Sequence, residues 1–310
     1  MTQWRLASTL LQFNILFPDF IGDFCCNSFL RPVILSPCIK RPVYCNGAIS
    51  NRSAMTLAFH KYQGTGNDFV MIDNRNRLFD HNDLNLIGRL CDRRFGIGAD
   101  GVILIEEDEA TDFEMVYFNP DGSQSLCGNG SRCAVMFARA LGMIGEQTTF
   151  KAVDGVHEAE IKGDQVHLLM HDVTEVQRQG DDFIIDTGSP HYIQYVEGLS
   201  DMDIVAGGQG IRYSDPFKAE GINVNFVEPL ADGQLKIRTY ERGVENETLS
   251  CGTGCTAVAL SAALNGSASP VKLNAQGGEL QVSFQQNERG FEQIYLIGPA
   301  KKVFEGEVHW

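Results

Sequence analysis

Two cysteine–glycine motifs hold the residues of this chain that are best suited to acid–base chemistry. Cys127 opens the run Cys-Gly-Asn-Gly-Ser-Arg-Cys, and Cys251 opens the run Cys-Gly-Thr-Gly-Cys. Each run continues into apolar residues at helical spacing and stops at a glycine, so each cysteine is predicted to stand at the first turn of a helix. A strand-like run and a polar turn precede each motif, which indicates a duplicated unit of strand, turn, cysteine and helix.

The start of a helix favours the thiolate form of a cysteine, because unsatisfied N–H groups and the positive end of the helix dipole lie there. A free thiol with a pKa near ~8.5 lies roughly 2 kcal/mol away from half ionisation at neutral pH. A helix terminus supplies up to ~2 kcal/mol, which would bring one thiol close to half ionisation. A second thiol facing the same small cavity should stay protonated, because like charges resist joint ionisation.

One thiolate and one thiol on opposite sides of a carbon suit the inversion of a stereocentre, since one removes a proton and the other delivers one. The carbanion would need N–H donors for its carboxylate, each worth roughly 3–4 kcal/mol. The two motifs supply these donors at Gly128, Asn129, Gly252 and Thr253. Without a pyridoxal lysine motif or metal-ligand cluster in the sequence, we expect racemisation or epimerisation of an amino acid with no cofactor and no metal.

The alternative is that the cysteines only fill space in the core, as free cysteines commonly do. We expect that role for Cys133 and Cys255, which lie inside the predicted helices. For Cys127 and Cys251, the glycine context and the duplication favour the catalytic interpretation.

Composition narrows the function further. The 310 residues, 43% hydrophobic and 21% charged, are ordinary for a soluble protein with room for two domains. A net charge of −15 argues against nucleic-acid binding and against an anionic membrane surface. Nine cysteines, an odd and sparse number, fit a reduced cytoplasmic protein, and no apolar run is long enough to cross a membrane.

Residues 1–54 differ from the rest of the chain. They carry five basic and two acidic residues, four of the nine cysteines, and prolines and aromatics without helical or strand period. We expect this segment to be a disordered extension or an over-extended start, with translation beginning at Met55. A transit peptide is the alternative.

From residue 55 the chain alternates between short strand-like runs and a few helical ones. Strands are expected at 57–62, 69–73, 102–106, 156–161, 165–170, 183–186, 191–196, 277–284, 292–297 and 300–308, and helices at 83–94 and 256–264. The second helix is apolar nearly all round, which predicts that it is buried. We expect an α/β (α+β) fold of two pseudo-symmetric domains, each a mostly antiparallel curled sheet around a central helix.

Two further patterns need interpretation. Residues 96–101 match G-x-G-x-x-G, but these glycines follow a helix and open a strand, whereas a dinucleotide-binding loop does the reverse. We therefore do not expect NAD. The run Gly-Ile-Asn-Val-Asn-Phe at 221–226 echoes Gly-Thr-Gly-Asn-Asp-Phe at 64–69, a second hint of duplication. Taken alone, Asn67 could simply satisfy its turn, and His191 could be an ordinary histidine at a strand edge.

From Met55 to Trp310 the chain resembles the diaminopimelate epimerases. Six ordered motifs carry the resemblance: Gly-Thr-Gly-Asn-Asp-Phe at 64–69, Arg-Phe-Gly-Ile-Gly-Ala-Asp at 94–100, Phe-Asn-Pro-Asp-Gly-Ser with Cys-Gly-Asn-Gly-Ser-Arg at 118–132, Ser-Pro-His at 189–191, Gly-Ile-Asn-Val-Asn-Phe at 221–226, and Tyr-Glu-Arg-Gly with Cys-Gly-Thr-Gly at 240–254. The resemblance implies cofactor-independent interconversion of LL- and meso-2,6-diaminopimelate, on the route to lysine and cell-wall peptide. It implies domains of residues 55–172 plus 299–310 and of residues 173–298.

The resemblance also implies roles for individual residues. Cys127 and Cys251 would be the acid–base pair, with the reacting carboxylate held by Gly128, Asn129, Gly252 and Thr253. The amino and carboxylate groups of the substrate would meet Asn67, Asn119, Asn223, Glu241 and Arg242. Two residues, His191 and Glu241, would tune the thiols. Partners would be limited to the small-molecule substrate, with no nucleic acid or membrane, and a homodimer is one assembly to consider.

The chain departs from the family at two positions, where Gly101 stands in place of a frequent glutamine and Ser189 in place of a frequent asparagine. Two other functions remain open. A proline or hydroxyproline racemase of the same fold would leave Arg242, Asn119 and Asn223 without a purpose, because a cyclic amine has no distal amino-acid group. A thiol redox or metal-binding protein would be expected to carry C-x-x-C spacing, which the sequence lacks.

Overall fold

The computed structural model describes residues 56–309, so the prediction for residues 1–54 lies outside the described residues. Its helices are α1 (Leu84–Cys91), α2 (Gly128–Ala140), α3 (Ile204–Arg212) and α4 (Gly252–Leu264), with a short 3-10 turn at Leu199–Asp201. The strands are β1 (Thr56–Gly64), β2 (Asn67–Asp73), β3 (Gly101–Glu106), β4 (Phe113–Phe118), β5 (Gln147–Ala152), β6 (Gly155–Lys162), β7 (Gln165–Leu169), β8 (Val176–Gln179), β9 (Asp182–Asp186), β10 (Pro190–Tyr195), β11 (Asn223–Pro229), β12 (Leu235–Glu241), β13 (Asn246–Thr248), β14 (Val271–Ala275), β15 (Gly278–Asn287), β16 (Gly290–Pro299) and β17 (Lys301–His309).

The strand pairings repeat, which confirms the predicted duplication. Along β1 to β7 the successive neighbours are antiparallel, parallel, antiparallel, parallel, antiparallel and antiparallel. The series β9, β10, β11, β12, β14, β15, β16 follows the same order. The helix α2 connects β4 to β5, and α4 connects β12 to β14, so each cysteine helix occupies the same place in its own series.

The second predicted hint of duplication joins strands that are not equivalent. Asn67 opens β2, whereas the similar run near Asn223 opens β11, whose counterpart in the first series is β3. The position equivalent to β2 is taken by β10, which carries His191. The likeness of the two runs therefore comes from their shared role at the start of a strand, not from their place in the repeat.

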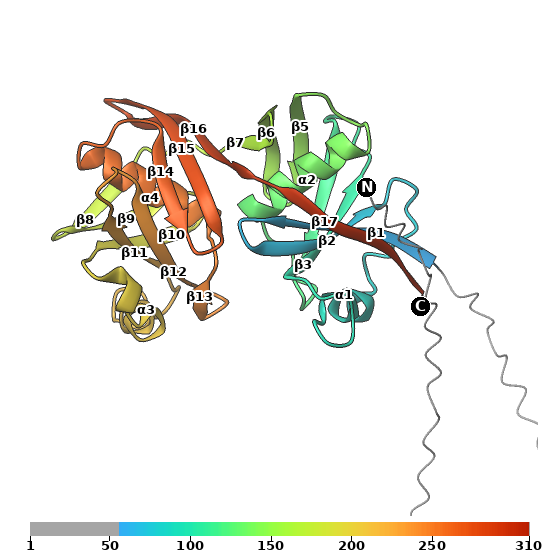
Figure 1. Ribbon diagram of the computed structural model, residues 1–310, viewed down its shortest axis with the longest axis horizontal. Helices are drawn as coiled ribbons and strands as arrows, with labels where there is room; N and C mark the ends of the chain where they lie inside the picture. The colour runs from blue at the N-terminus through green and yellow to red at the C-terminus, as the bar shows by residue number, and fades with distance from the viewer. Residues whose placement is uncertain (1–55, 310) are drawn as a thin grey trace, which may run out of the picture. The chain divides into compact units, whose positions relative to one another are not determined.

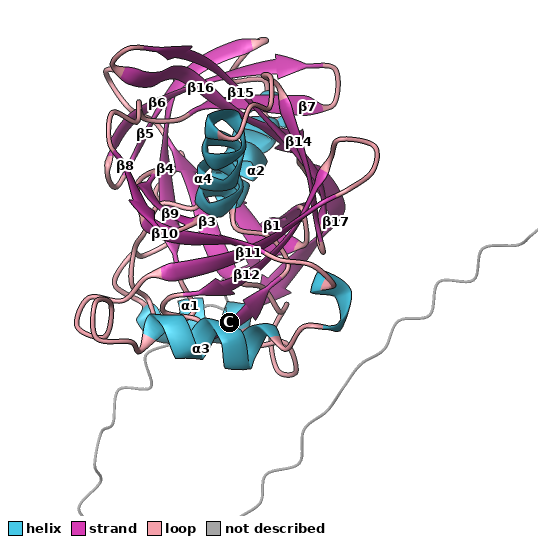
Figure 2. Ribbon diagram, turned by 90° about the vertical axis from the view of Figure 1, so that its left-hand side faces the viewer, coloured by secondary structure: helices cyan, strands magenta, loops and turns pink. Residues whose placement is uncertain are grey.

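The two cysteine helices lie inside the strands (Figure 1). Figure 2 shows α2 and α4 in the middle with strands around them, while α1 and α3 lie outside. The residues Val258, Ala259 and Leu260 of α4 are fully buried, and so are Cys133, Ala134 and Val135 of α2. This is the burial that the all-round apolar sequence of the second helix predicts.

The last strands tie the two series together. The strand β16 pairs with β15 and also with β7, and the chain then continues through β17, which pairs with β1 (Figure 1). The final strand thus lies beside the first strand of the described chain. The exact domain boundaries, at residues 172–173 and 298–299, remain a prediction.

Two other sequence expectations concern the outer elements. The helix expected at 83–94 is shorter, because Asp92 already has an extended backbone and caps the helix end. The glycines of residues 96–101 lie between α1 and β3, in the helix-to-strand order that the sequence indicates. Within residues 56–309, no helix is both long and apolar enough to cross a membrane.

Candidate active site

The starts of the two cysteine helices meet at a pair of glycines. A Cβ atom built on Gly252 would lie 3.7 Å from the Cα atom of Gly128 and 2.9 Å from Cδ2 of Leu296. The same atom built on Gly128 would lie 3.3 Å from Leu296 and 3.9 Å from the Cα atom of Gly252. Larger residues would therefore push the two helix starts apart. The first N–H groups of both helices have no partner inside their own helix, so this meeting point is suited to an anion.

Cys127 caps α2 with its own sulfur. The Sγ atom accepts a hydrogen bond from the N–H of Gly130 at 3.5 Å, and it lies 3.7 Å from Oδ1 of Asn67. The backbone of Cys127 is extended, and its carbonyl accepts the first helical hydrogen bond, from Ser131. The sulfur thus points toward the N–H groups at the helix start, as predicted.

Cys251 caps α4 and reaches a chain of polar side chains. Its Sγ atom lies 3.4 Å from Oγ1 of Thr253, which lies 2.9 Å from Nε2 of His191. On the other side of the ring, Nδ1 of His191 lies 3.0 Å from the amide nitrogen of Asn225, whose oxygen accepts from Thr239. Since the amide donates to Nδ1, the histidine proton sits on Nε2 and points at Thr253. The threonine hydroxyl is then free to donate to the sulfur of Cys251.

The side chain of Asn129 forms hydrogen bonds that link the segment of Cys127 to the segment of Cys251. Its side-chain nitrogen donates to Oδ1 of Asn67 at 3.1 Å and to the carbonyl of Ser250 at 3.0 Å. Its side-chain oxygen accepts from Thr65 and from Arg132. Every polar atom of this amide is occupied, so the side chain positions its neighbours and leaves only its backbone N–H for a ligand.

A cavity of about 930 Å³ opens beside these helix starts. Five of the predicted site residues line it: Asn67, Asn119, Cys127, Glu241 and Arg242. Ser250, the residue before Cys251, also lines it. The remaining predicted residues do not line the cavity. Cys251, Gly128, Asn129, Gly252 and Thr253 form the helix starts, His191 contacts Thr253, and Asn223 contacts Arg242.

The cavity lining carries four carboxylates and two guanidinium groups, and two of these charges, Glu241 and Arg242, are not paired with each other. Within residues 56–309, the side chain of Glu241 accepts only from the Thr248 hydroxyl, at 2.9 Å. Arg242 donates to the carbonyls of Glu220 and Gly221, and among residues 56–309 it forms no ion pair. An ammonium group and a carboxylate group would complement these two charges.

The ionisation of the two thiols differs from the sequence expectation. Burial raises the pKa of Cys127 to about 11, and the N–H groups of Gly130 and Asn129 offset only part of this rise. Burial also raises the pKa of Cys251 well above its usual value, with the charge of Glu241 acting in the same direction. The predicted half ionisation of one thiol does not hold without a ligand, because the helix terminus is weaker than desolvation.

His191 is neutral in this site. It is fully buried, and burial together with the nearby charge of Arg242 lowers its pKa to about 3. It can therefore influence Cys251 through hydrogen bonds but not through a positive charge. Glu241 acts on both thiols through its negative charge, which raises the pKa of each. Burial raises the pKa of Glu241 itself.

Asn223 and Ser189 are held in internal contacts. The side-chain oxygen of Asn223 accepts from the N–H of Arg242 at 2.9 Å, and its nitrogen donates to Pro190 and Ser189. The hydroxyl of Ser189 lies 3.1 Å from Nε2 of His191. Asn223 thus fixes the position of Arg242, which lines the cavity, whereas Ser189 contacts His191 and Thr253, which do not line it.

Sequence reasoning missed Tyr117. A Cβ atom built on Gly101 would lie 2.3 Å from the ring of Tyr117 and 2.6 Å from the carbonyl of Phe118. The tyrosine ring therefore takes the space beside Gly101 that a side chain would need. Its hydroxyl lines the cavity and donates to Oδ1 of Asn119 at 2.8 Å. The only signal in the sequence is the pairing of a glycine at the start of one strand with an aromatic residue on the next.

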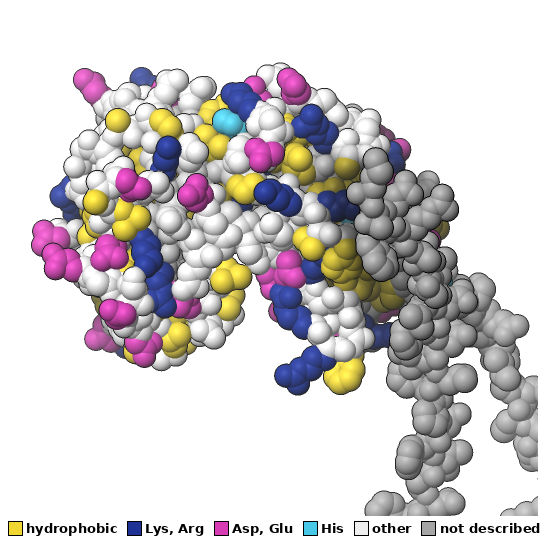
Figure 3. Space-filling view, in the orientation of Figure 1, with side chains coloured by type: hydrophobic (Ala, Val, Ile, Leu, Met, Phe, Trp, Pro, Cys, Tyr) yellow, Lys and Arg dark blue, Asp and Glu magenta, His cyan; other side chains and the backbone are white. Residues whose placement is uncertain are grey.

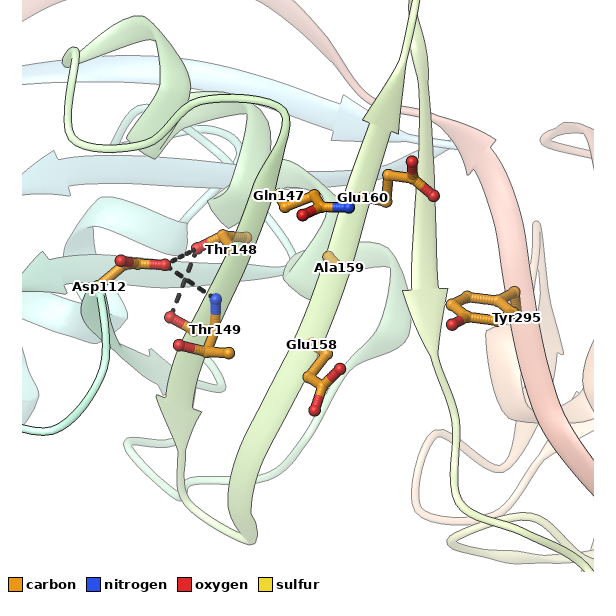
Figure 4. A pocket seen from close by; sticks show the side chains of 8 residues that line it. All are labelled: Asp112, Gln147, Thr148, Thr149, Glu158, Ala159, Glu160 and Tyr295. Atoms are coloured by element: carbon orange, nitrogen blue, oxygen red, sulfur yellow. Dashed lines mark hydrogen bonds between the residues drawn. The ribbon is translucent and has the colours of Figure 1, made fainter.

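A second cavity, of about 360 Å³, lies elsewhere on β5 and β6 (Figure 4). It contains none of the predicted site residues. One of its three carboxylates, Asp112, is already occupied, because it accepts from the hydroxyl of Thr148 and the N–H of Thr149. The lining contains no cysteine, so the acid–base chemistry of paired thiols belongs to the helix starts.

Comparisons with known proteins give the family of the chain. A sequence model of the family "Diaminopimelate epimerase" matches residues 59–176 and 183–303. A diaminopimelate epimerase from Flavobacterium psychrophilum is 51% identical over 253 residues, covering 80% of this chain and 99% of the relative. One from Aquifex aeolicus is 37% identical over 275 residues, covering 81% and 98%. Among solved structures, a phenazine biosynthesis protein of the PhzF family from Bacillus anthracis has a TM-score of 0.66 at 15% identity, covering 82% of this chain and 99% of that one.

Two cysteine-capped helices that meet inside a duplicated, mostly antiparallel fold define an isomerase of the epimerase and racemase type. A hydroxyproline epimerase from Agrobacterium vitis shares the fold, with a TM-score of 0.58 at 16% identity over 82% of this chain and 92% of that one. The chain belongs to the diaminopimelate epimerase family. Its activity is the epimerisation of diaminopimelate, which the family supports over both the racemase and the thiol redox or metal-binding alternatives.

Removing the hydroxyl of Tyr117 should weaken substrate binding. In Tyr117→Phe, Oδ1 of Asn119 loses its donor, and the amide is then held only through its nitrogen, which donates to Ser123 and Ser125. A lost hydrogen bond of about 1 kcal/mol predicts a KM for diaminopimelate raised roughly 5-fold, with kcat changed much less. The control is Tyr192→Phe, which loses a hydroxyl bonded to Asp182 and not part of the cavity lining. Equal KM values for the two variants would show that Tyr117 does not orient Asn119.

Proposed function

We propose that this chain converts LL-2,6-diaminopimelate to meso-2,6-diaminopimelate with Cys127 and Cys251 as a two-base pair and without a cofactor. The observation that carries the proposal is the meeting of two cysteine-capped helix starts beside one cavity. A thiolate on one side removes the α-proton, and the thiol on the other side returns its own proton to the opposite face of the carbon. One S–H bond forms as another breaks, so the pair ends with its protonation reversed.

The reacting carboxylate is placed at the helix starts. The N–H groups of Gly128, Asn129, Gly252 and Thr253 belong to the first turns of α2 and α4, and an anion there would satisfy the unpaired ends of both helices. Negative charge grows on this carboxylate as the α-proton leaves. The same N–H groups then bind more strongly in the transition state, at roughly 3–4 kcal/mol for each well-placed donor.

The amino groups and the distal carboxylate are assigned to the cavity lining. Glu241 suits an ammonium group, because in the described part of the chain its carboxylate has only the Thr248 hydroxyl as a partner. Arg242 suits a carboxylate, because its guanidinium forms no ion pair within the described residues and can bind two oxygens side by side. Asn67 and Asn119 add amide groups on the α2 side of the cavity. Asn223 contributes by fixing the backbone of Arg242.

Exchange with heavy water tests the two-base mechanism. Wild-type protein given LL-diaminopimelate in heavy water should place deuterium at the inverted centre, since the returning proton comes from a thiol that exchanges with solvent. Cys127→Ser and Cys251→Ser should each lose turnover by ~10²-fold or more, because a serine hydroxyl is a far weaker acid. The control is Cys255→Ser, which changes a buried cysteine on the helix that follows Cys251. It should keep its turnover as long as it folds.

Full activity in either single variant at position 127 or 251 would rule out the cysteine pair. Product without deuterium would argue for a proton that stays shielded on one base. Mass spectrometry of the product and chiral separation of the isomers provide both measurements.

Replacing Glu241 should separate thiol ionisation from substrate binding. In Glu241→Gln the negative charge that raises the pKa of both thiols is gone, so both should be alkylated by iodoacetamide at lower pH. Turnover should nevertheless fall by roughly 10-fold or more, because the ammonium group loses its charged partner. Asp121→Asn removes another carboxylate of the cavity lining that shifts neither thiol, and it is the control. If Glu241→Gln lowered both the rate of alkylation and turnover, the charge of Glu241 would not be what raises the pKa of the two thiols.

We also place the protein in the cytoplasm, as a homodimer. Support for the dimer comes from β17, which pairs only with β1 among the described strands and exposes Val303 by 58%. Hydrophobic side chains gather on the face of the molecule near β1 and β17 (Figure 3). The strand begins with two lysines and carries two glutamates further along, so an antiparallel second copy would bring opposite charges together.

A substitution on this edge tests the dimer. Wild-type protein should sediment at twice the chain mass of 34.2 kDa, and Val303→Lys should sediment as a monomer. Val153→Lys, altered at a residue that is 57% exposed in the turn between β5 and β6, should remain dimeric. Wild-type protein that sediments as a monomer, or Val303→Lys protein that still sediments as a dimer, would overturn this assembly.

A further inference from the structure

Arg132 is a buried charge that the mechanism above does not use. It is the largest side chain in the described part of the protein with essentially no exposure to solvent. It lies on α2, five residues after Cys127, and its guanidinium turns back toward the helix start. An arginine stays charged in a protein interior, and its burial without compensation is costly.

All the partners of Arg132 within residues 56–309 are neutral. Its terminal nitrogens donate to Oδ1 of Asn129 at 2.9 Å, to the hydroxyl of Thr65 at 2.9 Å and to the carbonyl of Gly128 at 3.3 Å, while Nε has no hydrogen-bond partner. By contrast, Arg93 and Arg238 are each paired with carboxylates. The protein thus keeps one positive charge in its core without a counter-ion.

The surrounding strands leave room for this charge through glycines. A Cβ atom built on Gly298 of β16 would lie 3.2 Å from Nε of Arg132, and one built on Gly64 of β1 would lie 3.6 Å from its terminal nitrogen. The titratable groups that face the guanidinium are Cys127 and Cys133 on α2 and Cys255 on α4. Of these three thiols, only Cys127 lines the cavity.

We propose that Arg132 is a positioning residue whose unpaired charge keeps the start of α2 electropositive, so that Cys127 forms its thiolate there and the substrate carboxylate binds beside it. The hydrogen bonds to Asn129 and Gly128 aim this charge at the helix start. They also add to the polarisation of the backbone that the helix dipole supplies. The proposal rests on the proposed function only in giving Cys127 the role of a base.

The charge of Arg132 should affect the pKa of Cys127 more than the pKa of Cys251. The charge of Arg132 lowers the pKa of Cys127, partly offsetting the rise caused by burial and by Glu241. The groups that act on Cys251 are instead Glu241, Thr253, Gly254 and Cys255. Cys251 therefore serves as an internal reference in the same molecule.

Two variants separate the charge from the hydrogen bonds. Arg132→Gln keeps a hydrogen-bond donor and removes the charge, whereas Arg132→Lys keeps the charge and loses the fork of donors. The rate of iodoacetamide labelling is followed against pH, peptide by peptide, by mass spectrometry. Labelling needs no substrate, so its result is independent of whether diaminopimelate is turned over. Thermal unfolding shows that each variant is folded.

In Arg132→Gln, we expect the labelling profile of Cys127 to move about one pH unit higher, the size of shift that one nearby charge produces in a protein interior. The profile of Cys251 should move less, and Arg132→Lys should leave both close to wild type. If Arg132 had a purely structural role, the Gln and Lys variants would shift the labelling profile of Cys127 by the same amount or not at all, or the profiles of both cysteines would shift together. Any of these results would overturn the proposal.

Thr65→Val keeps the proposal testable if Arg132→Gln does not fold. This variant removes one hydrogen bond to the guanidinium and the hydrogen bond from Thr65 to Asn129, and it keeps the charge in place. Labelling of Cys127 should then match wild type. A shift of the Cys127 profile in Thr65→Val, as large as that expected for loss of the charge, would show that the hydrogen bonds alone matter and that the charge does not.

Discussion

The site depends on bringing the positive ends of two helices into contact. Gly128 and Gly252 allow the approach because neither has a side chain, and Leu296 closes the space behind them. Such an arrangement is unfavourable by itself, since two helix dipoles face each other and several N–H groups lack partners. The strands must therefore hold the helices in place. Two equivalent series of strands, joined through β16 and β7, do so from both sides.

At the two cysteines, burial and the nearby N–H groups shift the thiol pKa in opposite directions. Desolvation raises the pKa of both thiols, and Glu241 raises them further, while the N–H groups at the helix starts act in the opposite direction. A substrate that carries an ammonium group and a carboxylate changes this balance. The ammonium group would offset the charge of Glu241, and the carboxylate would satisfy the helix ends. Ionisation of a thiol is then coupled to binding, so the free site does not keep an exposed, reactive thiolate.

The sequence allowed prediction of what local patterns determine. The cysteine–glycine runs predicted both helix starts, and the periodicity predicted the buried helix and most of the strands. What sequence reasoning missed depends on contacts between distant segments. Tyr117 matters because it fills the space beside Gly101 on the next strand, and Arg132 matters because its neighbours come from β1 and β16. The thiol pKa values were predicted too low because a helix start can be read from the sequence, whereas the depth of burial cannot.

The duplicated frame places its two cysteines in equivalent positions but gives them different neighbours. Cys127 meets Asn67, the N–H of Gly130 and the field of Arg132, whereas Cys251 meets Thr253 and, through it, a neutral His191. The two centres of LL-diaminopimelate are equivalent, so the proposed contacts of Glu241, Arg242, Asn119 and Tyr117 would have to distinguish the reacting centre from the distal one. On this proposal the repeated backbone would align the two sulfurs with one carbon, and the different side chains around them would hold the distal end of the molecule.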